Sequence, residues 1–206
     1  MNDEVFLKTI RQHIPEATIR YCYELWLTYE FKFIVKKKRA TKLGDYSYSS
    51  LTGKHTITVN GDLNKYAFLI TYLHEVAHLT TGINHGYQVK PHGEEWKNRF
   101  KELVYPVLRE DIFPPDVIVP LHDYISNPKA SSCSDADLLR ALGEHDEHKH
   151  AFLSDIKIGE SFRFNKKYYV KESTVRTRAV CKDLTSNKKY YIPLAAQVDV
   201  VQPLLF

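Results

Sequence analysis

Apolar side chains in the first forty residues follow a helical period and then change to a strand pattern. Two helices are expected, and the second begins at Pro15. It carries a stripe at i, i+3, i+4 and i+7 spacing, made of Ile19, Cys22, Tyr23 and Trp26. Three short β-prone segments follow over 31–35, around Tyr46 and Tyr48, and over 55–59, with Gly44 and Gly53 in the connections. The pattern predicts two helices and then a small three-stranded sheet.

The next stretch is apolar on nearly every side, as in a helix buried in the middle of a domain. Asn60-Gly61-Asp62 supplies a turn and a candidate N-cap, which predicts a helix over about 63–81 with Gly82 as its C-terminal cap. Another helix is expected to begin near Pro91 or His92. Its evidence is a run of apolar residues at helical spacing, namely Trp96, Phe100, Leu103 and Val104.

The C-terminal half has shorter elements. Pro114-Pro115 predicts the start of one short helix, and Ser134-Asp135-Ala136-Asp137 resembles a capping box for another that ends at Gly143. Residues 144–150 are wholly polar and are typical of a linker. Beyond them, short alternating segments predict a small antiparallel β module, and they cover 162–164, 167–171, 178–182 and 189–192. We therefore expect an α+β domain over 1–108, a helical extension and linker over 109–150, and a β module over 151–206.

Composition adds limits on the class of protein. A chain of 206 residues with 43% hydrophobic content can bury a core. The net charge is +4, and residues 151–206 hold ten Lys and Arg against five Asp and Glu, so the basic character belongs to the β module. No apolar run approaches the roughly 20 residues of a membrane span, and no signal peptide is recognisable, so a cytoplasmic protein is expected. The widely spaced Cys22, Cys133 and Cys181 suit buried thiols.

The motif His74-Glu75-Val76-Ala77-His78 lies in the predicted buried helix. Residues four apart share a helix face, so His74 and His78 can present two imidazoles to one Zn²⁺. Glu75 lies beside them, where a carboxylate can take a proton from water that the zinc has activated. The motif thus predicts a catalytic zinc site that hydrolyses peptide bonds.

A catalytic zinc has three protein ligands, so one more must come from outside the motif. His85 and His92 are the candidates. The spacing from His78 to His85 is one residue longer than in the metzincin motif. His92 falls on the expected helical stripe with Trp96 and Phe100. This favours His92 as the third ligand, with His85 as the alternative.

The order of elements, with Leu73-His74-Glu75-Val76-Ala77-His78 and His92-Gly93-Glu94-Glu95-Trp96, resembles the SprT-like family of zinc metallopeptidases. That family includes the Spartan proteases, which digest proteins crosslinked to DNA. The resemblance covers about residues 5–108. It implies a zincin-like fold, one Zn²⁺ held by His74, His78 and His92, Glu75 as catalytic base, and a protein substrate that is associated with DNA. Many family members end in a four-cysteine zinc ribbon, which the two cysteines of this C-terminal half exclude.

Two features point to nucleic acid as a partner, and each has a simpler interpretation. Basic and aromatic residues alternate over 162–178, as on platforms that stack single strands, but also as on any small basic barrel. The run Lys36-Lys37-Lys38-Arg39 can contact phosphates or form a solvated edge. The alternative function is therefore a nucleic-acid-associated binding protein with a structural or vestigial zinc. Glu75 argues against it, because a structural site needs no neighbouring carboxylate.

Overall fold

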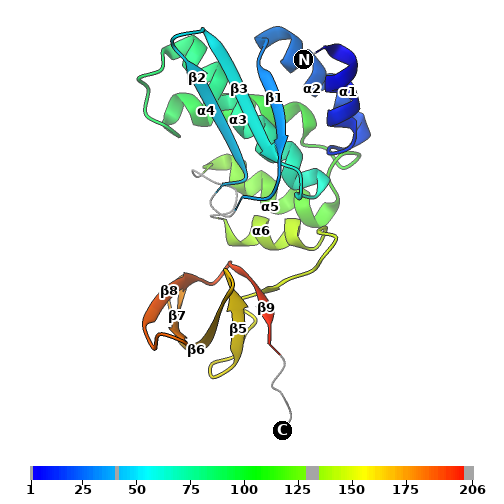
Figure 1. The fold of residues 1–206 in the computed structure, drawn as a ribbon. Coiled ribbons are helices and arrows are strands. Elements are labelled where there is room, and N and C mark those ends of the chain that lie inside the picture. Colours follow the sequence, from blue (N-terminus) through cyan, green and yellow to red (C-terminus); the bar gives the residue numbers. More distant parts are fainter. Residues whose placement is uncertain (1, 40–41, 129–134, 202–206) are drawn as a thin grey trace. The chain divides into compact units, whose positions relative to one another are not determined.

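The computed structural model describes residues 2–39, 42–128 and 135–201, and the chain divides into two compact units, Met1–Ser132 and Cys133–Phe206 (Figure 1). The first unit has a three-stranded sheet and the second a six-stranded antiparallel sheet, which confirms the α+β class. The helix α5 belongs to the first unit and α6 to the second. The partition into 1–108, 109–150 and 151–206 stays a prediction.

The first unit opens with α1 (Asp3–Arg11), η1 (Glu16–Thr18) and α2 (Ile19–Tyr29). The side chain of Asn2 caps α1 by accepting from the backbone N–H of Val5. The buried stripe of α2 consists of Ile19, Cys22, Leu25 and Trp26. Leu25 thus takes the place that the spacing had assigned to Tyr23, which is only half-buried and bonds Asp3 instead.

The sheet of this unit holds β1 (Lys32–Lys36), β2 (Gly44–Ser49) and β3 (Lys54–Asn60) in the order β1-β3-β2. The pair β1 and β3 is parallel, and β2 runs antiparallel to β3. Its central strand buries Ile57 and Val59 completely. Since β2 is an edge strand, one side of its backbone is not paired by any described strand.

Helix α3 (Lys65–His85) packs on β2 and β3, and α4 (Glu94–Val104) packs on α3 (Figure 1). The expected start and end of α3 were wrong. Asn64 is the N-cap, because its Oδ1 accepts from the backbone N–H groups of Tyr66 and Ala67 at 3.1 and 3.0 Å. Gly82 lies inside the helix, which ends at His85 with Gly86 as its C-cap, where φ is 84°.

The expected start of α4 was also wrong. The helix begins at Glu94, and Gly93 is its N-cap in an extended conformation. His92 has φ of 57°, a left-handed conformation that cannot continue a helix. A short η2 (Tyr105–Val107) and α5 (Pro115–Ser126) complete the unit, and α5 begins at the proline pair as predicted. No described helix is both long and apolar enough to cross a bilayer.

The second unit begins with α6 (Ala136–Gly143), which is capped by Asp135 and ends where predicted. Ser134 of the expected capping box and Cys133 lie outside the described residues. The strands are β4 (Ala151–Phe152), β5 (Ser161–Phe164), β6 (Lys167–Val175), β7 (Arg178–Asp183), β8 (Lys189–Pro193) and β9 (Gln197–Val200). Their order is β4-β9-β5-β6-β7-β8. The four predicted segments form strands, and β4 and β9 were not predicted.

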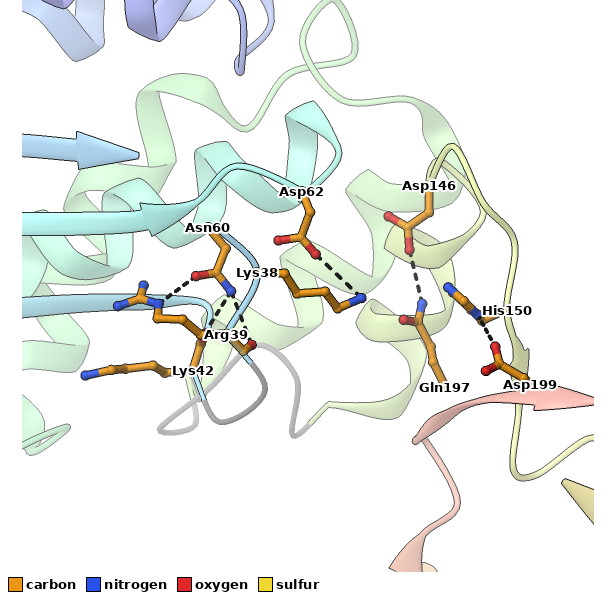
Figure 2. Close-up of polar contacts among 9 residues, drawn as sticks. All are labelled: Lys38, Arg39, Lys42, Asn60, Asp62, Asp146, His150, Gln197 and Asp199. Carbon is orange, nitrogen blue, oxygen red and sulfur yellow. Dashed lines mark hydrogen bonds and ion pairs between the residues drawn. The ribbon is translucent and has the colours of Figure 1, made fainter. Parts of the chain in front are cut away.

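The polar segment 144–150 is tied to β9 rather than free. Gln197 donates to Asp146 at 3.1 Å, and His150 Nδ1 lies 3.0 Å from Asp199 (Figure 2). In the core, Lys171 is only 4% exposed, and its ammonium donates to the carbonyls of Leu153 and Ile156. With the bond from Arg140 of α6 to Asp155, these contacts make the second unit a packed module in which α6 and the polar segment take part.

Candidate metal centre

Three histidine side chains meet between α3 and the start of α4. His74 and His78 lie one turn apart on α3, and His92 reaches them from the loop that precedes α4. The Nε2 atoms are 3.2 Å apart for His74 and His78, 2.9 Å for His78 and His92, and 3.2 Å for His92 and His74. They form the group of histidines, cysteines and acidic residues that can hold a metal ion among the described residues.

The triangle of nitrogens fits a metal better than it fits hydrogen bonds. Each Nε2 offers a single in-plane N–H or lone pair, so three mutual contacts cannot all be hydrogen bonds. Nitrogens that lie about 2.0–2.1 Å from a tetrahedral zinc are about 3.3 Å from one another. The observed distances are close to this value. The three nitrogens are thus spaced to hold one tetrahedrally coordinated metal ion such as zinc.

Aromatic rings surround the triangle on the side of α4. The ring of Trp96 lies 4.6, 5.2 and 4.6 Å from those of His74, His78 and His92, and Phe100 stacks on Trp96. Burial, followed by the neighbouring imidazoles, lowers the pKa of His74 well below its usual value and that of His78 to about 4. Burial also lowers the pKa of His92. The rings are therefore neutral at pH 7, which is the form that binds metals.

Glu75 is only 6% exposed and turns toward β2. Its carboxylate accepts from the backbone N–H of Tyr46. A Cβ atom added to Gly44 would lie 2.8 Å from Glu75 Cγ and closer still to Oε1. Burial, and then the charge of Asp45, raise the pKa of Glu75 to about 8 against the opposing effects of Arg39, the Tyr46 N–H and Lys42. The carboxyl group of Glu75 thus lies between α3 and the edge strand β2.

A polar network joins Arg39 and Lys42 to the end of β3 (Figure 2). Arg39 donates from Nε to Asn60 Oδ1 at 2.7 Å and from Nη1 to Thr58 at 2.9 Å. The amide of Asn60, which is 1% exposed, donates to the carbonyls of Lys42 and Arg39. Arg39 therefore helps to hold β3 and the residues that precede Gly44. Of the basic run 36–39, only the three lysines are exposed. Sequence reasoning missed both Gly44 and Asn60, since their roles depend on contacts across the sheet.

The two candidates for a third ligand lie in different places. His92 joins His74 and His78, whereas His85 is exposed and lines a pocket with Asn84, Glu94 and other polar residues. The reasoning from a helical stripe was wrong, because His92 precedes the helix. Its left-handed backbone and Gly93 turn the chain so that the imidazole faces α3.

Comparison with known proteins gives a family assignment. The model of the SprT-like family matches residues 12–112, which include the three histidines, Glu75, Gly44 and Asn60. Comparisons with curated proteins and with solved structures each found no significant match.

Proposed function

Since the chain belongs to the SprT-like family through residues 12–112, we propose that it is a zinc-dependent metallopeptidase. In this proposal His74, His78 and His92 hold one Zn²⁺, and Glu75 is the general base. The observation that carries it is the meeting of three neutral imidazoles, whose Nε2 atoms lie within 3.2 Å of one another, next to the buried carboxyl group of Glu75 on α3.

Hydrolysis of a peptide bond needs a side chain that accepts and donates protons. It also needs neighbouring groups that hold this side chain in the right orientation. A zinc ion, when bound, supplies a Lewis acid and acidifies a water molecule. Glu75 ionises more readily beside a cation than its metal-free pKa of about 8 indicates. It then takes the proton from the attacking water and donates it to the leaving amine. The backbone N–H of Tyr46 and the close approach of Gly44 hold the carboxylate in one orientation.

The edge strand supports a peptide as the substrate. The backbone N–H of Asn60 donates to Leu43 on the paired side of β2. Pairing alternates along an antiparallel strand, so the backbone groups of Tyr46 and Tyr48 point away from β3. The Tyr46 N–H bond to Glu75 agrees with this. Glu75 occupies the Tyr46 N–H, so an extended peptide can pair with β2 through the carbonyl of Tyr46 and the backbone groups of Tyr48, beside the metal centre.

The alternative of a structural or vestigial zinc has less support. A structural zinc has four protein ligands, whereas the group formed by the described residues supplies three. Burial of the Glu75 carboxyl group on α3 also costs free energy, and a role in catalysis would account for this cost.

Substitution of the base tests the proposal. We expect Glu75→Gln to lower kcat/KM on a mixture of fluorogenic peptides by about 10²–10⁴-fold, because general base catalysis is lost. The amide has nearly the same size, so zinc content measured by mass spectrometry should stay at one ion per chain. Full activity of the Glu75→Gln variant would contradict the mechanism.

The ligand set is tested separately by zinc content. We expect His92→Ala to lose zinc, since two imidazoles remain, and His85→Ala to keep it as a matched control. Loss of zinc from His85→Ala with retention in His92→Ala would overturn the assignment. A purified protein without zinc that also fails to bind added zinc would refute the metallopeptidase itself.

One observation also favours nucleic acid as a partner, and hence a substrate associated with DNA. Tyr191 on β8 and Tyr168 on β6 are 62% and 47% exposed. The strand registers place both on the outer face of the sheet, together with Lys182 and Lys189, which pair directly. Exposed aromatic rings among cations are the groups that stack and neutralise a single strand. This face supports binding of single-stranded nucleic acid by the second unit.

Fluorescence anisotropy with a labelled single-stranded oligonucleotide tests this second candidate. We expect a Tyr168→Ala/Tyr191→Ala variant to bind at least about tenfold more weakly, since stacking contributes about 1–3 kcal/mol per base. Tyr105→Ala, which removes an exposed tyrosine of the first unit, is the control. Equal binding by all three proteins would exclude the face.

A further inference from the structure

Four rings form a row that extends from the candidate metal centre along the edge strand, and we call it the aromatic ledge. It consists of Tyr46 and Tyr48 on β2, His55 on β3 and Tyr87 in the loop after α3. The rings of Tyr48 and Tyr87 are stacked, with centroids 4.1 Å apart and planes 10° apart. His55 lies 5.0 Å from Tyr48, and its Nδ1 is 3.0 Å from the hydroxyl of Tyr46. The backbone of Tyr46 binds Glu75, so the ledge begins at the proposed base.

Glycines allow Tyr87 to lie where it does. A Cβ atom at Gly82, inside α3, would meet the Tyr87 ring at 2.7 Å, so this position must be glycine for the ring to rest on the helix. Gly86 has φ of 84° and turns the chain between α3 and Tyr87. The same loop carries His92. The ledge and the metal centre are therefore built by the same strand, helix and loop.

The outer part of the ledge is exposed although its rings are stacked. Tyr48 and Tyr87 are 38% and 46% exposed, and the neighbouring Ile83 at the end of α3 is 46% exposed. Leu51, at the tip of the hairpin that follows Tyr48, is 96% exposed. Packing of the loop explains why Tyr48 and Tyr87 are stacked. It does not explain why this apolar surface is exposed to solvent. Exposed apolar groups that are gathered beside a candidate site are typical of a surface that binds a ligand.

The backbone of β2 defines which part of a peptide reaches the ledge. A peptide paired with the outer side of β2 has one residue opposite Tyr46 and another, two positions away, opposite Tyr48. These two residues are separated by about 7 Å. Both side chains point to the face on which Tyr46 and Tyr48 lie, because side chains alternate along a strand. The residue opposite Tyr48 therefore meets the exposed rings of Tyr48 and Tyr87.

We propose that the aromatic ledge is a specificity subsite that binds an aromatic side chain of the peptide substrate, two residues from the one that lies opposite Tyr46. The uncharged ring faces favour an apolar planar group. A pair of aromatic rings contributes more binding free energy than the burial of their surface area alone. This inference rests on the proposed function, since it assumes a peptide on the edge strand.

The test uses labelled peptides in which a single Phe occupies successive positions of an otherwise identical sequence of Ala, Ser and Gly. Binding to the Glu75→Gln variant is measured by fluorescence polarisation, and hydrolysis by the wild type is followed by mass spectrometry. We expect Phe peptides to bind about tenfold more tightly than the parent without Phe, as for one added aromatic contact. We also expect the cleaved bond to lie at a constant distance from the Phe.

Variants assign the preference to the ledge. Tyr48→Ala/Tyr87→Ala should bind Phe and parent peptides equally, whereas Tyr48→Phe/Tyr87→Phe keeps the rings and the preference. Tyr105→Ala is the control for loss of an exposed tyrosine elsewhere in the first unit. Thermal melts and zinc content check that each variant is folded, and the single Tyr87→Ala variant replaces the double one if the latter unfolds.

The possible outcomes separate the subsite from the activity. Hydrolysis of all peptides with no Phe preference overturns the subsite and leaves the metallopeptidase standing. A Phe preference in binding without any hydrolysis supports the ledge as a peptide site and contradicts the metallopeptidase. Binding of a single-stranded oligonucleotide that is lost in Tyr48→Ala/Tyr87→Ala, without binding of any of the peptides, would overturn the peptide assignment.

Discussion

Replacement of Gly44 by alanine tests how tightly the proposed base is held. The added Cβ would meet Thr71 Cγ2 at 2.7 Å and Glu75 Cγ at 2.8 Å, and ordinary contacts begin at 3.4 Å. The contact with Oε1 is the shortest, so the carboxylate must move by about 1 Å, since β2 and the buried α3 resist displacement. A misplacement of this size in a reacting group costs about 10²-fold in rate, and overpacking costs about 1–3 kcal/mol in stability. We expect Gly44→Ala to lose about two orders of magnitude in kcat/KM and to keep its zinc.

The matched control is Gly53→Ala in the β2–β3 hairpin. Gly53 has φ of +64°, and a Cβ there meets nothing within 4 Å. This substitution strains the backbone by about 1 kcal/mol without touching Glu75. Fluorogenic peptide hydrolysis, zinc content and thermal unfolding are measured for both variants, below the melting temperature of each. If Gly44→Ala matches Gly53→Ala in kcat/KM, the close approach of Glu75 to the strand is not needed for catalysis.

Three other predictions concern stability. Asn60→Ala removes a buried partner of Arg39 and should lower the free energy of unfolding by about 1–3 kcal/mol, whereas Asp62→Ala, whose carboxylate pairs with Lys38 at the surface, should cost less than about 1 kcal/mol. Equal costs in urea unfolding would refute this. In metal-free protein the pKa of Glu75 is raised from 4.5 to about 8, so its contribution to stability is complete below pH 4.5 and is lost as the pH rises to about 8. Glu75→Gln should remove this slope, and a slope that persists would contradict the shift. Lys171→Met leaves two carbonyls without a charged donor and should destabilise the second unit by about 1.5–3 kcal/mol. Unchanged unfolding of that unit would show that the ammonium is dispensable.

Local patterns were sufficient for most elements of the fold. The apolar helix with His74 and His78, the three strands before it and four strands of the second unit all follow from periodicity. The strand β4 was missed because two residues carry no alternation, whereas β9 alternates polar and apolar residues over Gln197–Val200 and could have been recognised. The ends of the helices were predicted least well. Gly82, for example, is the residue type typical of a C-cap, but it lies inside α3 and makes room for the ring of Tyr87.

The candidate site was only partly readable from the sequence. The pair His74 and His78 and the adjacent Glu75 are linked by helical spacing, which is a local property. His92 was chosen for a position on a helix that it does not occupy. Gly44 and Asn60 act across the sheet, and Tyr87 stacks on a strand that lies far from it in the sequence. No periodicity encodes such contacts, so these residues become visible only in three dimensions.

The division of the three histidines between a buried helix and a loop bears on how quickly a metal ion would exchange. Local opening of a loop costs little free energy, whereas a core helix opens only when much of the domain unfolds. His92 lies in the segment 86–93 between α3 and α4, so its imidazole can leave the site while His74 and His78 remain in place. Loss of the ion would then proceed through a state with two protein ligands. The exchange rate would be set by opening of this loop rather than by unfolding of the domain.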